Sequence, residues 1–231
     1  MKRYRDLFFD LDHTLWDFEG NSRAVLRELH AELGLLEHGI DADGFLEVYE
    51  EVNAQLWGKM ESGAIDKGVL RVLRFRNSLL HFGLKDDRLA RTMGEEYLLR
   101  CPERSGLNPG AGELLRDLQG HYRMHIITNG FHEVQLRKLV ASSIKEHFEV
   151  IVSSEQAGAA KPSARIFQHA LRAAGATAEA SMMIGDNAVA DVRGAREAGL
   201  DQVHYAPAGK ADPEATFTID HFDGLRRILL H

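Results

Sequence analysis

Hydrophobic and polar positions form two kinds of pattern along this chain. Near the start, Leu7-Phe8-Phe9 is a short apolar run, typical of a buried strand, and it ends at Asp10. From Asn21 to Arg100, apolar residues recur at the three- and four-residue intervals of helix faces. Glycines break this region at Gly34, Gly39, Gly63 and Gly83. The spacing therefore predicts a bundle of about four helices.

Beyond this region, strand and helix patterns alternate. Strands are expected at His125–Thr128, Glu149–Ser153, Ser181–Gly185 and Gln202–Tyr205, and helices after Pro109-Gly110 and at His132–Val140, Ala164–Ala174 and Val189–Ala198. This alternation is typical of a parallel sheet with helices on both faces, and the first strand gains partners only by joining it. The predicted fold is thus α/β. A Rossmann-like, doubly wound core of residues 1–15 and 104–231 carries an inserted four-helix cap, residues 16–103.

Composition narrows the classes of partner. The formal net charge of −7 is opposite to the basic surplus of most nucleic-acid binders, so no nucleic-acid polymer is expected. No stretch approaches the roughly 20 apolar residues of a membrane helix, and no membrane partner is expected. Cys101 is the single cysteine and the sequence shows no leader pattern, so the chain is expected in the cytoplasm. A monomer or a homodimer is expected.

Polar residues follow each predicted strand. They are Asp10, Asp12 and Thr14 after the first, Thr128, Asn129 and Gly130 after the next, Lys161 after the third, and Asp186, Asn187 and Asp191 after the fourth. Each cluster alone is typical of a turn or a helix cap. Ligands of open parallel sheets, however, bind beyond these carboxyl ends. Four clusters on one sheet edge favour a single site.

This set of side chains suits phosphoryl transfer. Asp10 is predicted to attack phosphorus, and Asp12 to protonate the leaving oxygen and later accept a proton from water. Thr128 is expected to donate to a phosphate oxygen, and Lys161 to offset charge in the transition state. Backbone amides around Asn129-Gly130 are expected to bind the substrate.

A cation is predicted beside the nucleophile. Carboxylates close together need a compensating charge, and Mg²⁺ prefers oxygen ligands. Asp10 and Asp186 are the expected side-chain ligands. Asp191 and Asn187 are expected to support the site without contacting the cation themselves, with Asp191 orienting either Lys161 or a metal-bound water.

The stretch Asp10-Leu-Asp12-His-Thr14, with Thr128, Lys161 and Gly185-Asp186 plus Asp191, resembles the four motifs of the haloacid dehalogenase superfamily of phosphohydrolases. The resemblance covers essentially the whole chain, and the position of the insert is similar to that of the superfamily's helical C1 cap. It implies that the backbone carbonyl of Asp12 also binds Mg²⁺. His13 departs from the pattern, because glycine is common there. An acid at Asp12 favours ester hydrolysis over halide displacement.

Within that superfamily, the chain is most similar to the pyrimidine 5′-nucleotidase branch. The similarity lies in Ile127–Phe131, Ser154–Gly158 with Lys161-Pro162, Leu56-Trp57 and Ser62–Ile65. It implies a small phosphorylated substrate, with a nucleoside 5′-monophosphate as the first expectation. Phe18 and Trp57 are candidates to stack on its base, with an ordinary role in cap packing as the alternative.

Three other functions stay open at this point. The chain could act on phosphoglycolate or a sugar phosphate, or it could be a phosphomutase with the same intermediate. It could also be a non-enzymatic phosphoryl-accepting or sensing module, although Asp12 has no evident purpose without a leaving group. A basic stretch in the cap, Arg71, Arg74 and Arg76, is expected to face solvent.

Overall fold

The computed structural model describes residues 4–207, 209 and 212–230. The chain divides into two compact units. One unit, the core, contains Met1–Phe18 and Glu103–His231, and the other, the cap, contains Glu19–Pro102. From the sequence pattern, the boundaries of the insert were expected after residues 15 and 103, whereas the two units divide after residues 18 and 102.

A parallel sheet forms the centre of the core. Its described strands are six, in the order β3-β2-β1-β4-β5-β6. Their bounds are β1 Asp6–Phe9, β2 Arg123–Thr128, β3 Phe148–Ser153, β4 Ser181–Gly185, β5 Asp201–Tyr205 and β6 Phe217–Ile219. Phe9, the last residue of β1, lies opposite Ile126 of β2 and Ile184 of β4. This order confirms the predicted doubly wound sheet, and it brings the ends of β1, β2 and β4 together.

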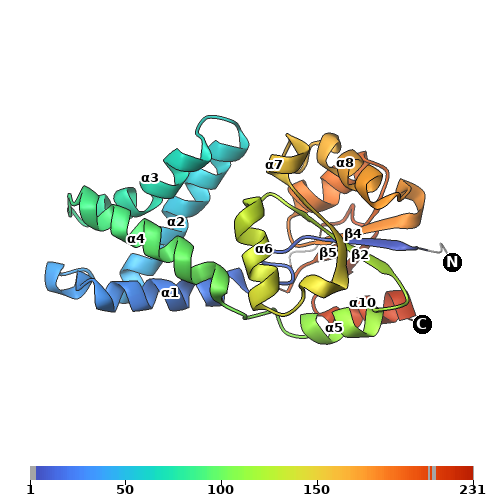
Figure 1. Cartoon of the computed structure of the whole chain (residues 1–231), viewed down its shortest axis with the longest axis horizontal. Coiled ribbons are helices and arrows are strands. Elements are labelled where there is room, and N and C mark those ends of the chain that lie inside the picture. The colour runs from blue at the N-terminus through green and yellow to red at the C-terminus, as the bar shows by residue number, and fades with distance from the viewer. Residues whose placement is uncertain (1–3, 208, 210–211, 231) are drawn as a thin grey trace. The chain divides into compact units, whose positions relative to one another are not determined.

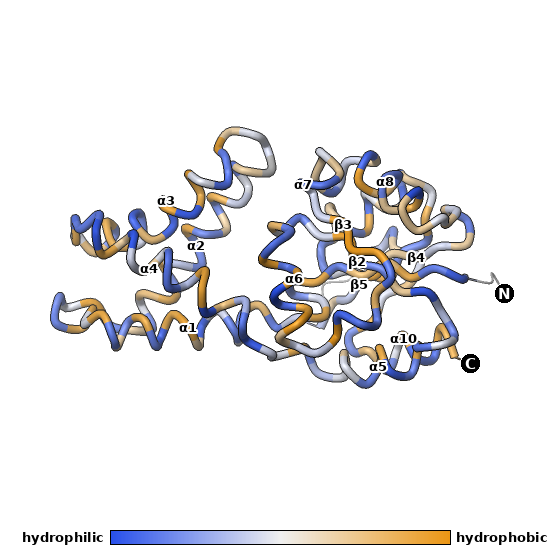
Figure 2. Tube along the Cα trace, in the orientation of Figure 1, coloured by the Kyte–Doolittle hydropathy of each residue, from blue (hydrophilic) through white to orange (hydrophobic). Residues whose placement is uncertain are grey.

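Helices cover both faces of this sheet. In the core they are α5 Ala111–Leu118, α6 His132–Ala141, α7 Ser154–Ala157, α8 Ala164–Ala174, α9 Gly194–Glu197 and α10 Phe222–Leu230, with short 3₁₀ turns at Lys145–His147 and Ala178–Ala180. A further 3₁₀ turn, Cys101–Glu103, spans the boundary between the two units. Figure 1 shows α7 and α8 on one side of the sheet, and α5 and α10 on the other. Buried side chains from the strands, including Phe8, Ile127 and Met183, pack against Ile166 and Phe167 of α8. Figure 2 shows the inner strands as largely hydrophobic segments, as a sheet covered on both faces requires.

Two parts of the core differ from the predicted elements. Strand β6 and helix α10 close the chain where no strand or helix was expected. The expected helix Val189–Ala198 is instead a π-helical turn, Ala188–Arg193, followed by α9. The turn widens because the carbonyl of Asn187 accepts from Val192, five residues on, as well as from Asp191. Such turns occur often at functional sites.

The cap has the four helices that the periodicity predicts. They are α1 Phe18–Glu32, α2 Ala42–Glu61, α3 Lys67–His81 and α4 Asp87–Arg100, with a 3₁₀ turn at Leu35–His38. Aspartates cap the last three: Asp41, Asp66 and Asp86 each accept a backbone N–H from the first turn.

Aromatic side chains fill the interior of the cap, and one basic residue joins them. Tyr49 packs against Phe75 and Tyr97, with ring centroids 5.0 and 5.8 Å away. The Arg74 guanidinium lies 4.6 Å from the Tyr97 ring centroid, and Arg74 is 4% exposed. The expectation that Arg74 faces solvent is therefore wrong, since its charge is placed over an aromatic face.

The two connections to the insert lie side by side within the core. Trp16 and Leu107 form an antiparallel bridge. Next to it, the Asp17 amide donates to the Gly106 carbonyl over 3.1 Å, and the Asn108 amide donates to Leu15 over 2.9 Å. The chain thus leaves and re-enters the core at one place.

None of the helices in the described ranges combines the length and the apolar character needed to cross a bilayer.

Candidate active site

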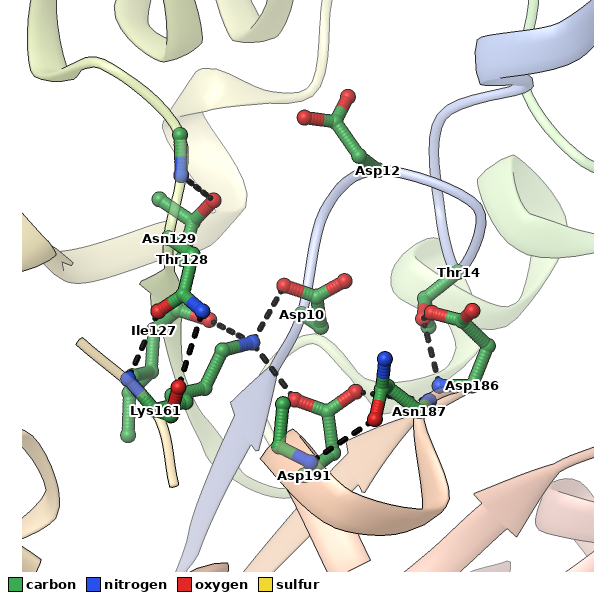
Figure 3. Close-up of polar contacts among 12 residues, drawn as sticks. Asp10, Asp12, Thr14, Ile127, Thr128, Asn129, Lys161, Asp186, Asn187 and Asp191 are labelled. Atoms are coloured by element: carbon green, nitrogen blue, oxygen red, sulfur yellow. Dashed lines mark hydrogen bonds and ion pairs between the residues drawn. The ribbon is translucent and has the colours of Figure 1, made fainter. Parts of the chain in front are cut away.

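Lys161 is the centre of the candidate site. Its Nζ donates to Asp10 Oδ1 and Asp191 Oδ1, both over 2.6 Å, and to the Ile127 carbonyl over 2.9 Å. Figure 3 shows the ammonium between the two carboxylates. Because these bonds use all three of its donors, the Lys161 ammonium has one fixed position beside Asp10.

The loop that carries Lys161 is tied to the end of β2 by Asn129. The side chain of Asn129 donates to the Lys161 carbonyl over 3.1 Å and accepts from the Lys161 amide over 2.7 Å. The predicted role of Asn129 in substrate binding stays a prediction. In this structure its side chain holds the lysine in place.

Thr128, the last residue of β2, is turned toward the same site. Its Oγ1 accepts from the Gly130 amide over 3.0 Å and from Gln135 Nε2 over 2.7 Å. With both acceptor positions occupied, the hydroxyl proton is left to donate elsewhere. The use of Thr128 as a donor to phosphate stays a prediction.

Asp186 is placed by a residue of the first motif. Thr14 Oγ1 donates to Asp186 Oδ1 and accepts from the Asp186 amide, both over 3.0 Å. Asn108 fixes the loop before it, donating to the carbonyls of His13 and Thr14. The sequence placed Thr14 in the polar cluster after the first strand but gave it no role, and it did not single out Asn108, because the partners of both residues lie far away in sequence.

Asp191 reaches this site because Gly185 has no side chain. A Cβ at Gly185 would lie 2.2 Å from Asp191 Oδ2, which accepts instead from the Asn187 amide over 3.0 Å. The Asn187 side chain turns away to cap the π-helical turn, accepting from Val189 and Ala190. Asn187 thus supports Asp191 through its backbone.

The charge balance of the site is strongly acidic. Burial raises the pKa of Asp10 well above its usual range, and the carboxylates of Asp191 and Asp186 raise it further, against the opposing effect of Lys161. Burial and Asp191 also raise the pKa of Asp186. For Lys161, burial disfavours the ammonium, but attraction to Asp10 and Asp191 outweighs it and raises the pKa. Without a bound cation, protonation of Asp10 and Asp186 is thus favoured.

A divalent cation fits this arrangement. Ligand atoms of Asp10, Asp186 and Asp191 lie within 4.8 Å of one another. Three carboxylates against one ammonium leave an excess of two negative charges. In the described part of the chain, the second oxygens of Asp10 and Asp186 and the backbone carbonyl of Asp12 accept no hydrogen bond, whereas both Asp191 oxygens are used. The free oxygens therefore come from Asp10, Asp12 and Asp186, an all-oxygen set suited to Mg²⁺.

The side chain of Asp12 has different neighbours. Its Oδ1 pairs with Lys138 Nζ over 2.5 Å, and its Oδ2 accepts from Gln135 Nε2 over 3.0 Å. In Figure 3 the Asp12 carboxylate points away from the Lys161 ammonium. Sequence reasoning missed Gln135 and Lys138, which lie on a helix expected only for packing.

Aromatic candidates for base stacking stay predictions. The Phe18 ring packs against His13, with centroids 4.7 Å apart, and lies 5.4 Å from Lys138 Nζ. Trp57 is a half-buried residue of α2 in the cap. His13 itself has a φ of 63°, in the left-handed region that favours glycine.

Comparison with known proteins places the chain among hydrolases. Residues 5–199 match the haloacid dehalogenase-like hydrolase family. The chain is 32% identical over 206 residues to the pyrimidine 5′-nucleotidase PynA of Streptococcus pneumoniae, covering 88% of this chain and 84% of that protein. It is 30% identical over 227 residues to the pyrimidine 5′-nucleotidase YjjG of Escherichia coli, covering 96% of each. The crystal structure of the HAD-hydrolase YfnB from Bacillus subtilis, bound to magnesium, superposes with a TM-score of 0.89 at 30% identity over the whole of both chains.

Proposed function

Because this chain belongs to the haloacid dehalogenase-like hydrolase family and is a phosphatase, we propose that it hydrolyses small phosphomonoesters with Mg²⁺ through a phosphorylated Asp10. A nucleoside 5′-monophosphate is the proposed substrate. The observation that carries the mechanism is the Lys161 ammonium, held 2.6 Å from both Asp10 and Asp191 beside the free oxygens of Asp10 and Asp186.

In the first step, an oxygen of Asp10 attacks phosphorus while the bond from phosphorus to the ester oxygen breaks. Asp12 gives its proton to that leaving oxygen, so the alcohol departs neutral. Bound Mg²⁺ would be held by Asp10, Asp186 and the Asp12 carbonyl, and it supplies positive charge near the phosphate oxygens. Lys161 adds positive charge near those oxygens, and the hydroxyl of Thr128 provides a further donor to them.

In the second step, water attacks the phosphorus of the acyl phosphate. Asp12, now a carboxylate, accepts a proton from this water, and the bond from phosphorus to Asp10 breaks. Inorganic phosphate leaves, and both aspartates return to their starting states. Lys161 keeps Asp10 oriented throughout, because its three donors are fixed by protein acceptors.

The substrate proposal rests on similarity to two pyrimidine 5′-nucleotidases, PynA and YjjG. A screen of phosphate release with Mg²⁺ tests it, using pyrimidine and purine nucleoside 5′-monophosphates, a sugar phosphate and phosphoglycolate. The expected result is the highest kcat/KM with a pyrimidine nucleotide. A clear preference for phosphoglycolate or the sugar phosphate would replace the nucleotide proposal and leave the mechanism intact.

The mechanism is tested by Asp10→Asn, which removes the nucleophile with almost no change in shape. Turnover of p-nitrophenyl phosphate should fall by at least about 10³-fold, with the thermal unfolding transition retained. Asp43→Asn is the matched control, because Asp43 is an exposed cap aspartate. If Asp10→Asn turned over at a rate close to that of the parent protein, Asp10 would not be the nucleophile.

A further inference from the structure

Helix α6 carries two polar side chains that are buried. Gln135 is 0% exposed and Lys138 is 4% exposed, and they lie three residues apart on the same helix. Burying an ammonium or an amide is costly unless each finds a partner. Both find the same partner, the carboxylate of Asp12.

The two contacts hold the carboxylate from both sides. Lys138 takes Oδ1 and Gln135 takes Oδ2, so the plane of the Asp12 carboxylate is fixed as well as its position. Gln135 Nε2 also donates to Thr128 Oγ1 over 2.7 Å, which links Asp12 to the end of β2. A single amide thus fixes Asp12 relative to the predicted phosphate donor.

Aromatic rings in turn fix the lysine. Lys138 Nζ lies 4.3 Å from the Trp16 ring centroid and 5.4 Å from that of Phe18. The electron-rich ring faces attract the Lys138 ammonium but, unlike a carboxylate, do not form an ion pair with it. Among the described residues, Asp12 is the one carboxylate that pairs with Lys138. The ammonium is therefore directed to Asp12 alone.

The chain also leaves room for this arrangement. A Cβ at Gly130 would lie 2.5 Å from Gln135 Cδ, so Gln135 occupies the space that a side chain at position 130 would take. Gly130 thus makes room for Gln135, in addition to its predicted contact with substrate.

We propose that Lys138 and Gln135 are positioning residues for Asp12, orienting its carboxylate for proton transfer to the leaving group. This inference rests on the proposed function. Proton transfer needs donor and acceptor within about 2.6–3.2 Å in the reacting complex, so freedom at Asp12 slows the step that depends on it.

Leaving groups of different acidity provide the test. An alkyl phosphate, such as a nucleoside 5′-monophosphate, needs a proton on its leaving oxygen, whereas p-nitrophenolate departs readily without one. The ratio kcat/KM reports only steps up to leaving-group departure, so the later role of Asp12 as a base does not enter. Lys138→Met should lower kcat/KM about 30- to 100-fold for the alkyl ester and less than about 3-fold for p-nitrophenyl phosphate.

Further variants separate orientation from packing. Gln135→Leu should give the same selective loss, and Lys138→Arg should restore part of the alkyl activity, because it keeps the charge. In an Asp12→Asn background, Lys138→Met should lower the residual alkyl kcat/KM by less than about 3-fold, as expected of two residues acting together. Arg137→Met is the matched control, since Arg137 is the neighbouring cation on α6 and pairs with Glu103 at the surface.

Several outcomes would overturn the proposal. An equal loss for both esters, especially as a rise in KM, would mean that Lys138 binds the phosphate itself or only supports packing. An unchanged alkyl rate in both Lys138→Met and Gln135→Leu would mean that Asp12 needs no positioning. If the parent protein released no phosphate from either ester, the proposed function would fail first. If Lys138→Met lost its unfolding transition, Gln135→Leu and Lys138→Arg would decide the question.

Discussion

At the scale of single residues, the site depends on where side chains are absent as much as on where they are present. Gly185 illustrates this, because the space beside it is filled by the carboxylate of Asp191. That carboxylate in turn holds the ammonium of Lys161. A methyl group at position 185 would thus displace Asp191 and, through Lys161, disturb the position of Asp10.

We predict that Gly185→Ala lowers the free energy of unfolding by about 1–3 kcal/mol and kcat by at least about 10-fold. The new Cβ must displace Asp191, and Lys161 then loses its second carboxylate. Chemical denaturation and phosphate release measure the two effects. Gly58→Ala is the control, because nothing lies within 4 Å of a Cβ there. Equal stabilities of the two variants would argue against the close approach.

His13 is strained where glycine would not be. Its φ of 63° costs a residue with a side chain roughly 1–2 kcal/mol. We predict that His13→Gly is at least as stable as the parent protein, and that His13→Val is about 1–2 kcal/mol less stable than His13→Gly. Denaturant unfolding gives this ranking. If the valine variant were the most stable of the three, the loop would not have the described conformation.

At the scale of elements, the sequence predicts what repeats and misses what is local or irregular. Periodicity locates the cap helices, because each helical turn places a residue on the buried face. Apolar runs locate β1 to β5, because a sheet covered on both faces buries successive residues of its strands. The three-residue strand β6 is too short to show a period. The π-helical turn depends on hydrogen bonds of Asn187 that no spacing displays.

The candidate site divides in the same way. Residues at strand ends, such as Asp10, Lys161 and Asp186, are visible because parallel strands bring their carboxyl ends together. Gln135 and Lys138 are not, because a helix that packs on a sheet carries many polar residues, and only coordinates show which of them reach Asp12.

Asn187 provides a test at the level of an element. Its side chain caps the π-helical turn, while its amide contacts Asp191. We predict that Asn187→Ala lowers the free energy of unfolding by about 1 kcal/mol. Asn187→Ser should be almost as stable as the parent protein, since serine also caps helices. Thermal or denaturant unfolding of both variants checks this. A large loss of activity in Asn187→Ser at unchanged stability would instead place the amide side chain in the reaction.

At the scale of the whole molecule, we expect the acidic site to make the free energy of unfolding depend on pH and on the proposed cation together. Folding raises the pKa of Asp10 and Asp186, chiefly by burial. A raised carboxyl pKa favours the folded state below the unfolded value of about 4, and this contribution is lost as pH rises through the folded value. Mg²⁺ competes with those protons, so it should stabilise the protein most where the carboxylates are ionised.

We therefore predict that Mg²⁺ raises the melting temperature more at pH 8 than at pH 5.5, relative to EDTA at the same pH. At a hundred times Kd, the gain in unfolding free energy is about 2.7 kcal/mol. Differential scanning calorimetry measures it, and Asp186→Asn should lose most of the difference. Full turnover in excess EDTA after metal stripping, or an equal shift at both pH values, would contradict the cation site.

The bridge between Trp16 and Leu107 has a consequence beyond this chain. The bridge joins the chain on either side of the insert, so the backbone of the core pairs with itself where the insert leaves and returns. An insert that leaves and returns through paired connections can be replaced or redesigned while the residues of the core stay the same. The insert and the core can then change independently of one another in evolution.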